Sequence, residues 1–183
     1  MGEQHARFAR RQPRRREHGF TLLELLVTIA VAAVLLGIAI PSYRGVVQRN
    51  AMAATVNDLV GDLQYARSQA VTRGQPVHLC KSADNATCAI KGSWSQGWLV
   101  YTPDPGSATS TPAGNRLRVH GALDGQVAIN GTNNTAAEVV FDANGFTTDF
   151  GSFTATADTA TRNTRIVISR SGRIRTEDAA KDE

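Results

Sequence analysis

The hydrophobic residues of this chain follow three patterns, and the first is a continuous apolar run near the N-terminus. The run covers 21 positions, from Phe20 to Ile40, and Glu24 is its one ionisable side chain. At about 1.5 Å per helical residue it reaches roughly 30 Å, the thickness of the apolar core of a bilayer. An arginine-rich segment precedes it, and such segments stay on the cytoplasmic side of a membrane. The run therefore predicts a membrane helix that places the rest of the chain outside the cytoplasm.

The second pattern is the three- and four-residue spacing of an amphipathic helix over about residues 42–73. Apolar residues at this spacing are Val56, Leu59, Val60, Leu63, Ala66 and Ala70. The polar positions between them are predicted to point elsewhere: Asn57, Asp58, Asp62, Gln64, Arg67 and Gln69. Gly74 and Pro76 mark the predicted end of this helix. Since the two segments are contiguous, they predict one long helix whose second half needs a partner layer for its apolar stripe.

The third pattern, over about residues 76–176, consists of short runs of branched and aromatic residues between Gly, Asn, Asp and Pro. Such runs predict strands, at Val77–Lys81, Gly97–Tyr101, Leu117–His120, Gln126–Ile129, Glu138–Asp142, Phe153–Thr156 and Arg165–Ser169. Residues 142–145 are typical of a hairpin turn between 139–141 and 146–147. Residues 102–115 and 130–137 are predicted loops, and 177–183 a short acidic tail. The predicted fold class is α+β, with the long helix packed on antiparallel β-sheet.

The charge of the chain is concentrated at its N-terminus. The 183 residues carry a formal net charge of +4. Six of the 20 basic and two of the 16 acidic residues lie in 1–19, which leaves 14 of each in 20–183. The overall basicity therefore belongs to the N-terminal segment, and an anionic partner of the remainder must be argued from local clusters of charge.

The sequence carries no arrangement that indicates an enzyme, and we expect neither catalysis nor a cofactor. Beyond the N-terminal segment there are two histidines, His78 and His120, and no nucleophile elbow, paired zinc-binding histidines or phosphate-binding glycine loop. Cys80 and Cys88 enclose seven residues, and in an oxidising compartment they would pair and close a short loop. Two alternatives stay open: a redox-active pair, although the spacing is not C-x-x-C, and a metal site with His78, which would lack a fourth ligand.

Glu24 distinguishes the apolar run from an ordinary anchor or a secretory signal peptide. A carboxylate within a membrane segment is costly unless it has a partner. The apolar run also continues past the small residues that would imitate a signal-peptide cleavage site. Residues 19–24, Gly-Phe-Thr-Leu-Leu-Glu, resemble the class III signal of type IV pilins and type II secretion pseudopilins. Pro41 falls where pilins commonly carry a helix-kinking proline.

The resemblance to pilins implies a specific processing route. A prepilin peptidase would remove the leader 1–19 by cutting after Gly19, and Phe20 would then be N-methylated. Glu24 would meet the N-terminal amine of a neighbouring subunit during filament assembly, which neutralises two groups that are each costly in lipid. Residues 20–41 would then be the transmembrane and assembly half of the helix. Residues 42–183 would be a periplasmic domain, in the inner membrane before assembly and on the pilus afterwards.

A second resemblance covers most of the chain from Gly19 to Arg175. The cysteine loop followed by Trp94-Ser95-Gln96-Gly97-Trp98 resembles the FimT branch of the FimT/GspH minor pilins, and so do residues 139–145 and 165–175. We expect Trp94 and Trp98 to be core or loop-anchoring residues. Some FimT-like proteins are associated with DNA uptake in natural transformation. Their C-terminal G-R-x-R motif, here Gly172-Arg173-Ile174-Arg175, is tied to DNA binding.

The distribution of arginines supports an anionic partner independently. Five arginines lie within residues 162–175, which contain no acid: Arg162, Arg165, Arg170, Arg173 and Arg175. Guanidinium groups suit phosphate oxygens. Within a strand, Arg173 and Arg175 would point to the same side, and Gly172 would allow a turn whose N–H groups face an anion. With no helix-turn-helix, zinc finger or aromatic ladder beside them, these arginines predict non-specific binding through phosphates.

Two functions of different classes follow from the sequence. The first is a minor pilin that binds DNA through the C-terminal arginines, with other pilins, the prepilin peptidase and the inner membrane as further partners. The second is a purely structural minor pilin or GspH-like secretion pseudopilin, in which the arginines pair with acids of a neighbouring subunit. The acids that follow the arginines, from Glu177 onward, keep the second function open.

Overall fold

The computed structural model describes residues 19–103, 115–157 and 163–179. The chain divides into two compact units, residues 1–41 and 42–183. One helix, α1 (Leu22–Arg73), is continuous in secondary structure through the boundary between the units. The single long helix predicted from the two contiguous patterns is therefore confirmed. The expected leader lies almost entirely outside the described residues.

In the first unit, α1 presents its large apolar side chains outward. Leu22 is 76% exposed and Ile40 is 51% exposed. An 18-residue window of α1 reaches a mean hydropathy of 2.7 with none of it buried, so this helix is long and apolar enough to cross a membrane. Thr21 precedes the first turn, and its Oγ1 accepts a hydrogen bond from the N–H of Glu24 (3.2 Å). This spacing of Thr and Glu is that of a capping box, in which a carboxylate also favours the positive end of the helix.

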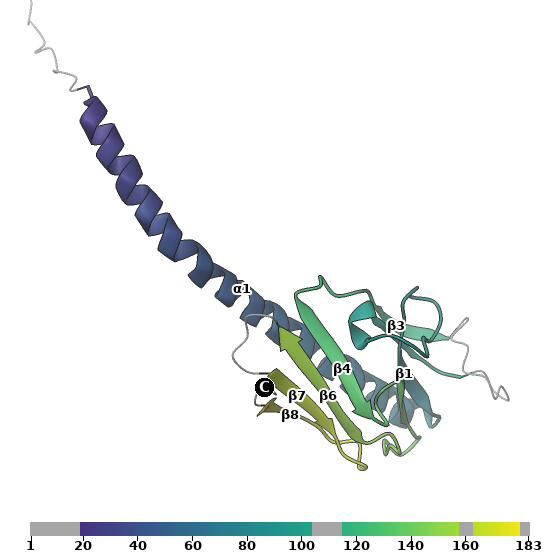
Figure 1. The fold of residues 1–183 in the computed structure, drawn as a ribbon. Helices are drawn as coiled ribbons and strands as arrows, with labels where there is room; N and C mark the ends of the chain where they lie inside the picture. Colours follow the sequence, from purple (N-terminus) through teal and green to yellow (C-terminus); the bar gives the residue numbers. More distant parts are fainter. Residues whose placement is uncertain (1–18, 104–114, 158–162, 180–183) are drawn as a thin grey trace, which may run out of the picture. The chain divides into compact units, whose positions relative to one another are not determined.

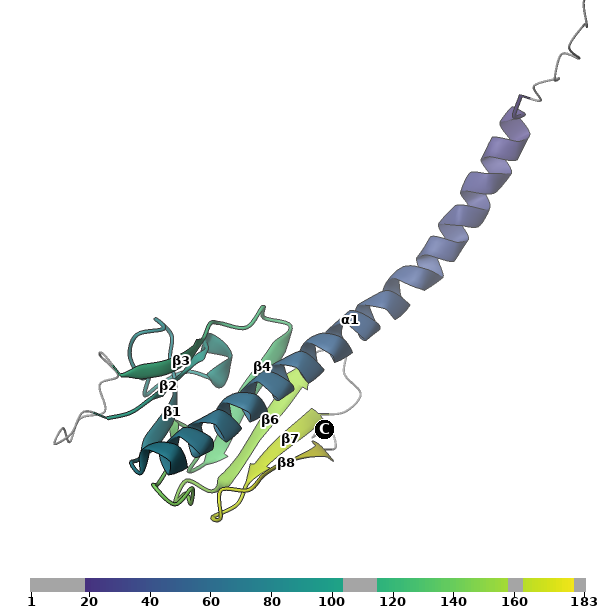
Figure 2. The ribbon, with the colours of Figure 1, turned by 180° about the vertical axis from the view of Figure 1, so that it is seen from behind.

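In the second unit, α1 packs one face against two antiparallel sheets (Figures 1 and 2). The buried residues of that face are Met52, Val56, Leu59, Leu63, Ala66 and Ala70. They are spaced three and four residues apart, as on one stripe of a helix. Gly74 follows Arg73 with a φ of 63°, the left-handed conformation that commonly ends a helix. The predicted apolar stripe of α1 is confirmed.

The first sheet has the strand order β3-β2-β1-β5, with all neighbours antiparallel. Its strands are β1 (Val77–Lys81), β2 (Trp98–Tyr101), β3 (Arg116–His120) and β5 (Glu138–Phe141), and a short 3-10 turn, η1 (Trp94–Gln96), precedes β2. One face of this sheet, with Val77, Leu79, Val139 and Phe141, joins the core under α1. The other face carries a smaller cluster around Cys80, Leu99 and Tyr101.

The second sheet has the order β4-β6-β7-β8, also antiparallel throughout, and Figure 1 shows these strands side by side. Its strands are β4 (Val127–Asn133), β6 (Gly151–Ala157), β7 (Asn163–Ile168) and β8 (Ile174–Ala179). Phe153, Ala155, Ile166 and Ile168 face the common core. Together, the helix and the two sheets confirm the predicted α+β class.

The structure corrects three details of the predicted strands. Residues 177–179, expected in an acidic tail, belong to β8, an edge strand whose exposed charged residues hid it from the pattern. The turn at 142–145 forms, since the N–H of Gly145 donates to the oxygen of Asp142 (2.9 Å), but residues 146–147 form no strand and β5 pairs with β1 instead. β4 runs on to Asn133, into the expected loop 130–137. Most of the other expected loop, 104–114, lies outside the described residues.

A polar pair within the core joins α1 to the first sheet. Trp98 is 1% exposed, and its Nε1 donates to Oδ2 of Asp62 (2.8 Å). Arg118 on β3 donates to the other oxygen of Asp62 (2.8 Å), and this partner raises the pKa of the guanidinium. Asp62 is therefore buried on the core side of α1, whereas the sequence pattern placed it outside. Trp94 is equally buried and donates to the oxygen of Thr135 (3.0 Å), so the expected core role of both tryptophans is confirmed.

The second unit carries its own core. Among the described residues, every buried hydrophobic side chain lies between Met52 and Ala179. The apolar run contributes nothing to this core, and both sheets are complete without it. A fragment comprising residues 42–183 therefore contains the interactions that fold it.

Candidate nucleic-acid interface

The arginines that were predicted to bind DNA lie on and around the hairpin formed by β7 and β8. In this pair Arg165 is opposite Glu177, and Val167 is opposite Arg175. Ile166 and Ile168 alternate with these residues and are buried in the core below α1. Because side chains alternate across a strand, Arg165 and Arg175 share the outer face of the sheet, away from α1. Arg162 lies outside the described residues.

The turn between the two strands depends on Gly172. Its φ of 70° lies in the left-handed region, and a Cβ there would collide with the carbonyl oxygen of Gly145. The N–H of Gly172 donates to the oxygen of Ser169 (2.9 Å), and the N–H of Ser169 donates to the oxygen of Arg173 (3.0 Å). Gly172 thus permits the turn, as expected, but its own backbone N–H is used within the turn and does not face an anion.

An arginine of α1 that the sequence pattern placed on the outer side holds this turn in place. Arg67 donates through Nε to the oxygen of Gly145 (3.0 Å) and through a terminal nitrogen to the oxygen of Ser171 (3.1 Å). It thereby ties the turn at 142–145 and the turn before β8 to the helix. Spacing along the helix carries no signal for this role, because both partners lie far away in the sequence.

Arg173 and Arg175 do not act from the same side, which corrects the expectation that both belong to one strand face. Arg173 precedes β8 and lines a hollow of about 460 Å³ on the α1 side, together with Arg67 and Val71. Arg175 lies within β8 and lines a separate hollow of about 300 Å³ on the outer face, together with Arg165. The G-R-x-R motif thus presents one arginine to each face of the hairpin.

The outer hollow combines charge with an aromatic ring. Phe150, which immediately precedes β6, lines it and is 38% exposed. The guanidinium of Arg170 lies over that ring, 4.4 Å from its centroid, a cation–π arrangement. Nε of Arg165 is buried and has no hydrogen-bond partner among the described residues. Among the described residues that line this hollow, Glu177 is the one acid, and its Oε2 lies 3.6 Å from Nε of Arg175.

The sequence shows no aromatic ladder beside the arginines, but the fold brings one aromatic ring, that of Phe150, next to them. Phe150 is 15 residues from Arg165 along the chain, but β6 pairs with β7, with Gly151 opposite Ile168. This pairing brings the start of β6 to the turn end of the hairpin. The position of Phe150 thus depends on strand order, which no local pattern reveals.

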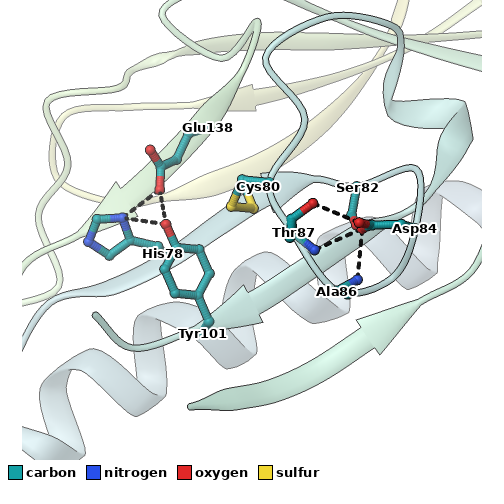
Figure 3. Close-up of a disulfide and its surroundings, with 9 residues drawn as sticks. His78, Cys80, Ser82, Asp84, Ala86, Thr87, Tyr101 and Glu138 are labelled. Carbon is teal, nitrogen blue, oxygen red and sulfur yellow. Dashed lines mark hydrogen bonds and ion pairs between the residues drawn. A yellow bond between two sulfur atoms is a disulfide. The ribbon is translucent and has the colours of Figure 1, made fainter. Parts of the chain in front are cut away.

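Cys80 and Cys88 form a disulfide on the first sheet (Figure 3). The enclosed loop is organised by Asp84, which accepts hydrogen bonds from the N–H groups of Ala86 and Thr87 and from the hydroxyls of Thr87 and Ser82. These bonds hold the pKa of Asp84 well below its usual range. The carboxylate of Asp84 thus provides hydrogen-bond partners for the backbone N–H groups of the loop, which indicates a structural role for the loop. The described residues contain no cluster of three or more His, Cys, Asp or Glu side chains that could hold a metal ion.

His78 belongs to a hydrogen-bonded group on the outer face of the same sheet (Figure 3). Its Nδ1 contacts Oε1 of Glu138, which also accepts a hydrogen bond from the hydroxyl of Tyr101 (2.8 Å). Burial acts to raise the pKa of Glu138, but the bonds from His78 and Tyr101 outweigh it, and the pKa lies below its ordinary value of 4.5. Asp149 behaves oppositely, because burial raises its pKa.

The lowered pKa of Glu138 predicts how stability responds to acid. The ionised Glu138 carboxylate stabilises the folded protein. This stabilisation is fully present at pH values above 4.5, the pKa in the unfolded chain, and is lost as the pH falls through the lower pKa of the folded state. We expect Glu138→Gln to lower the free energy of unfolding by about 1 kcal/mol at pH 7. This difference from the wild type should shrink as the pH falls below 4.5. Urea unfolding of both proteins across this range measures it, and a difference that grows towards acid would contradict the assignment.

The residues predicted for processing and assembly lie at the start of the described part of the first unit. Gly19 and Phe20 precede α1 and are exposed, Phe20 to 79%. Glu24 is in the first turn of α1, where its N–H is capped by Thr21. A Cβ placed on Gly19 meets no atom of the described residues within 4 Å, so these residues make no demand for glycine there.

Comparison with known families gives two matches. Residues 55–172 match the family described as Type II transport protein GspH. Residues 14–40 match the prokaryotic N-terminal methylation motif. The first match covers α1 from residue 55, the whole first sheet and strands β4, β6 and β7 of the second sheet, and it ends at Gly172 before β8. The second covers the predicted cleavage site with the apolar run.

Comparison with individual proteins points the same way. The chain is 27% identical over 104 residues to the type IV major fimbrial protein FimA of Dichelobacter nodosus, a match that spans 54% of this chain and 56% of the relative. The chain thus spans little more than half the length of that relative. Among solved structures, the minor pilin FimU of Pseudomonas aeruginosa is similar, with a TM-score of 0.56 at 23% identity over 70% of this chain and 90% of FimU. The minor pseudopilin EpsH of Vibrio cholerae has a TM-score of 0.50 at 9% identity, over 68% and 94% of the two chains. At these identities the structural matches show a shared fold.

Proposed function

The chain belongs to the family of the type II transport protein GspH, and on that premise we propose that it is a minor type IV pilin that binds DNA without sequence specificity and contributes to DNA uptake in natural transformation. In this proposal it is a structural, non-enzymatic subunit. The prepilin peptidase removes residues 1–19, and Phe20 is N-methylated. The match to the N-terminal methylation motif supports this processing.

The proposed placement follows from the apolar helix. Residues 20–41 anchor the subunit in the inner membrane, with the arginine-rich leader on the cytoplasmic side and residues 42–183 in the periplasm. Glu24 then meets the N-terminal amine of a neighbouring pilin in the assembled filament. The disulfide between Cys80 and Cys88 suits this oxidising compartment.

The observation that carries DNA binding is the outer hollow of the hairpin. Arg165 and Arg175 line it together, and the Nε donor of Arg165 has no partner there among the described residues. Arg175 and Glu177 are 56% and 41% exposed, so their ion pair contributes little and leaves the guanidinium available to phosphate. Arg170 and Arg173 extend the positive charge around the turn held by Gly172.

The competing function is a purely structural minor pilin or secretion pseudopilin. The Arg175–Glu177 contact favours it, because a strand that carries both charges could meet a neighbouring subunit with the opposite order of charges. In that case the arginines would pair with acids of another pilin, and DNA would not bind. A binding experiment separates the two functions.

We expect the fragment comprising residues 42–183 to bind duplex DNA weakly and in a salt-dependent manner. This fragment omits the leader, whose six arginines would bind DNA by themselves. Neutralising two to four phosphates gives a slope of about −2 to −4 when log affinity is plotted against log salt concentration. In Arg173→Ala/Arg175→Ala the slope should fall by about 2 and most of the affinity should be lost. Titration of labelled duplex at several salt concentrations measures both quantities.

A matched control removes charge from the other sheet. Arg116 is an exposed arginine on β3 that donates to the oxygen of Asn85 (2.8 Å), and Arg116→Ala changes the net charge by the same amount as one hairpin substitution. We expect it to leave DNA affinity within about two-fold, since the interface is local. If the wild-type fragment binds neither duplex nor single-stranded DNA even at low salt, DNA binding is excluded and the structural function takes its place.

A further inference from the structure

The outer hollow contains more than a phosphate site requires. Its polar lining comes from Thr132, Ser152, Arg165, Arg175 and Glu177, but Phe150 supplies an aromatic surface next to the charges. Phosphate contacts alone need cations and hydrogen-bond donors, and a partly exposed ring adds nothing to them. A ring beside two guanidinium groups is instead the combination that binds a phosphate together with the flat base attached to it.

We propose that the outer hollow binds single-stranded DNA, with a phosphate on Arg165 and Arg175 and the neighbouring base against Phe150. This inference rests on the proposed function and deepens it, because it names the form of DNA that the hairpin recognises. In a duplex the faces of the bases are covered by their neighbours in the stack, so a ring on the protein surface cannot stack on them. An unpaired strand can turn one base outward onto an aromatic side chain.

Three charged residues in or beside the hollow have contacts that suit this role. The Nε of Arg165 is buried without a partner among the described residues, which is costly unless a ligand accepts its hydrogen bond. Arg170 lies over Phe150 at 4.4 Å and braces the ring, and guanidinium planes also stack on bases. Glu177 is the group that a phosphate must displace from Arg175, and its distance of 3.6 Å makes that exchange a small loss.

Arg173, the first arginine of the G-R-x-R motif, is not among the residues that line the outer hollow. Arg173 lines the other hollow, together with Arg67 and residues of α1. Arg173 is thus placed to follow the sugar-phosphate backbone around the turn, whereas Arg165 and Arg175 act beside the ring. Loss of Phe150 should therefore change the preference between single strand and duplex without removing the affinity for phosphate.

The test compares three ligands on the fragment of residues 42–183: a single strand of about 12 nucleotides, the same strand in a duplex, and a strand of equal length that lacks its bases. We expect the wild type to bind the single strand more tightly than the duplex and the base-free strand by about five-fold or more, since stacking on an aromatic contributes about 1–3 kcal/mol per base. Phe150→Leu should lower the affinity for the single strand to that for the base-free strand, and leave affinity for the duplex within about two-fold.

The matched control is Phe146→Leu. Phe146 is also an exposed phenylalanine, at 53%, but it lines a different hollow with Asp142 and Thr148. We expect its substitution to leave all three affinities within about two-fold. Thermal unfolding of both variants checks that they remain folded, and the comparison of base-containing with base-free strands on the wild type needs no variant.

The outcomes distinguish this inference from the function on which it rests. If the wild type binds the strands with and without bases equally, or if Phe150→Leu leaves the single-strand affinity unchanged, the inference is overturned. When such a protein still binds duplex through the arginines, non-specific DNA binding stands without it. If the wild type binds neither single strand nor duplex, both proposals are overturned.

Discussion

A chain that carries Gly19→Val is expected to accumulate as the full-length precursor and to be absent from pili. If a prepilin peptidase cuts after Gly19, the side chain added at this position enters the site of cleavage. The described part of the chain accommodates the change, because a Cβ at Gly19 meets none of its atoms within 4 Å. The loss of processing would therefore come from the peptidase and not from misfolding. A gel that resolves the removal of 19 residues measures it, in cells that contain the peptidase.

A second glycine of the apolar run is the control for this experiment. Gly37 lies inside α1, and a Cβ there also meets nothing within 4 Å. We expect Gly37→Val to be processed like the wild type, since it leaves the segment apolar and lies far along the helix from the cleavage site. Normal cleavage of the Gly19→Val chain would contradict the proposed cleavage after Gly19. It would also contradict the proposed role of Glu24, which requires a free amine on Phe20 of the neighbouring subunit.

The largest loss of stability is expected from Trp98→Ala. The indole is 1% exposed, stacks on His120 with ring centroids 3.9 Å apart, and donates to Asp62 on α1. Truncating a buried aromatic of this size lowers the free energy of unfolding by about 3–5 kcal/mol. The variant also removes a hydrogen bond from a buried carboxylate, which adds to the loss. Urea unfolding of the fragment of residues 42–183, with the disulfide intact, measures the change.

Two further variants separate the loss of the hydrogen bond to Asp62 from the loss of the buried ring. Trp98→Phe keeps most of the ring but removes the Nε1 donor, and we expect a loss of about 1–3 kcal/mol, because Asp62 retains Arg118 as a partner. Val119→Ala on neighbouring β3, where the side chain is 47% exposed, should cost less than about 1 kcal/mol. Equal effects for Trp98→Ala and Val119→Ala would show that the indole does not join α1 to the sheet.

The features that could be predicted from the sequence are those whose signal is local. The apolar run, the stripe from Val56 to Ala70 and the cores of seven strands depend on residues two to four positions apart, and all appear in the structure. The disulfide was predicted from two cysteines that enclose seven residues, on the expectation of an oxidising compartment. The cluster of arginines was also visible, since charge along the chain can be counted directly.

What only the tertiary structure decided is how these elements face one another. Asp62 and Arg67 were assigned to the outside of α1 by spacing, but one meets Trp98, 36 residues away, and the other meets Ser171, 104 residues away. Strand order placed Phe150 beside Arg170, and the turn at Gly172 separated Arg173 from Arg175. Helical and strand periods report which side of its own element a residue occupies. Contacts between distant segments depend instead on register, turn geometry and strand order, which the whole fold sets together.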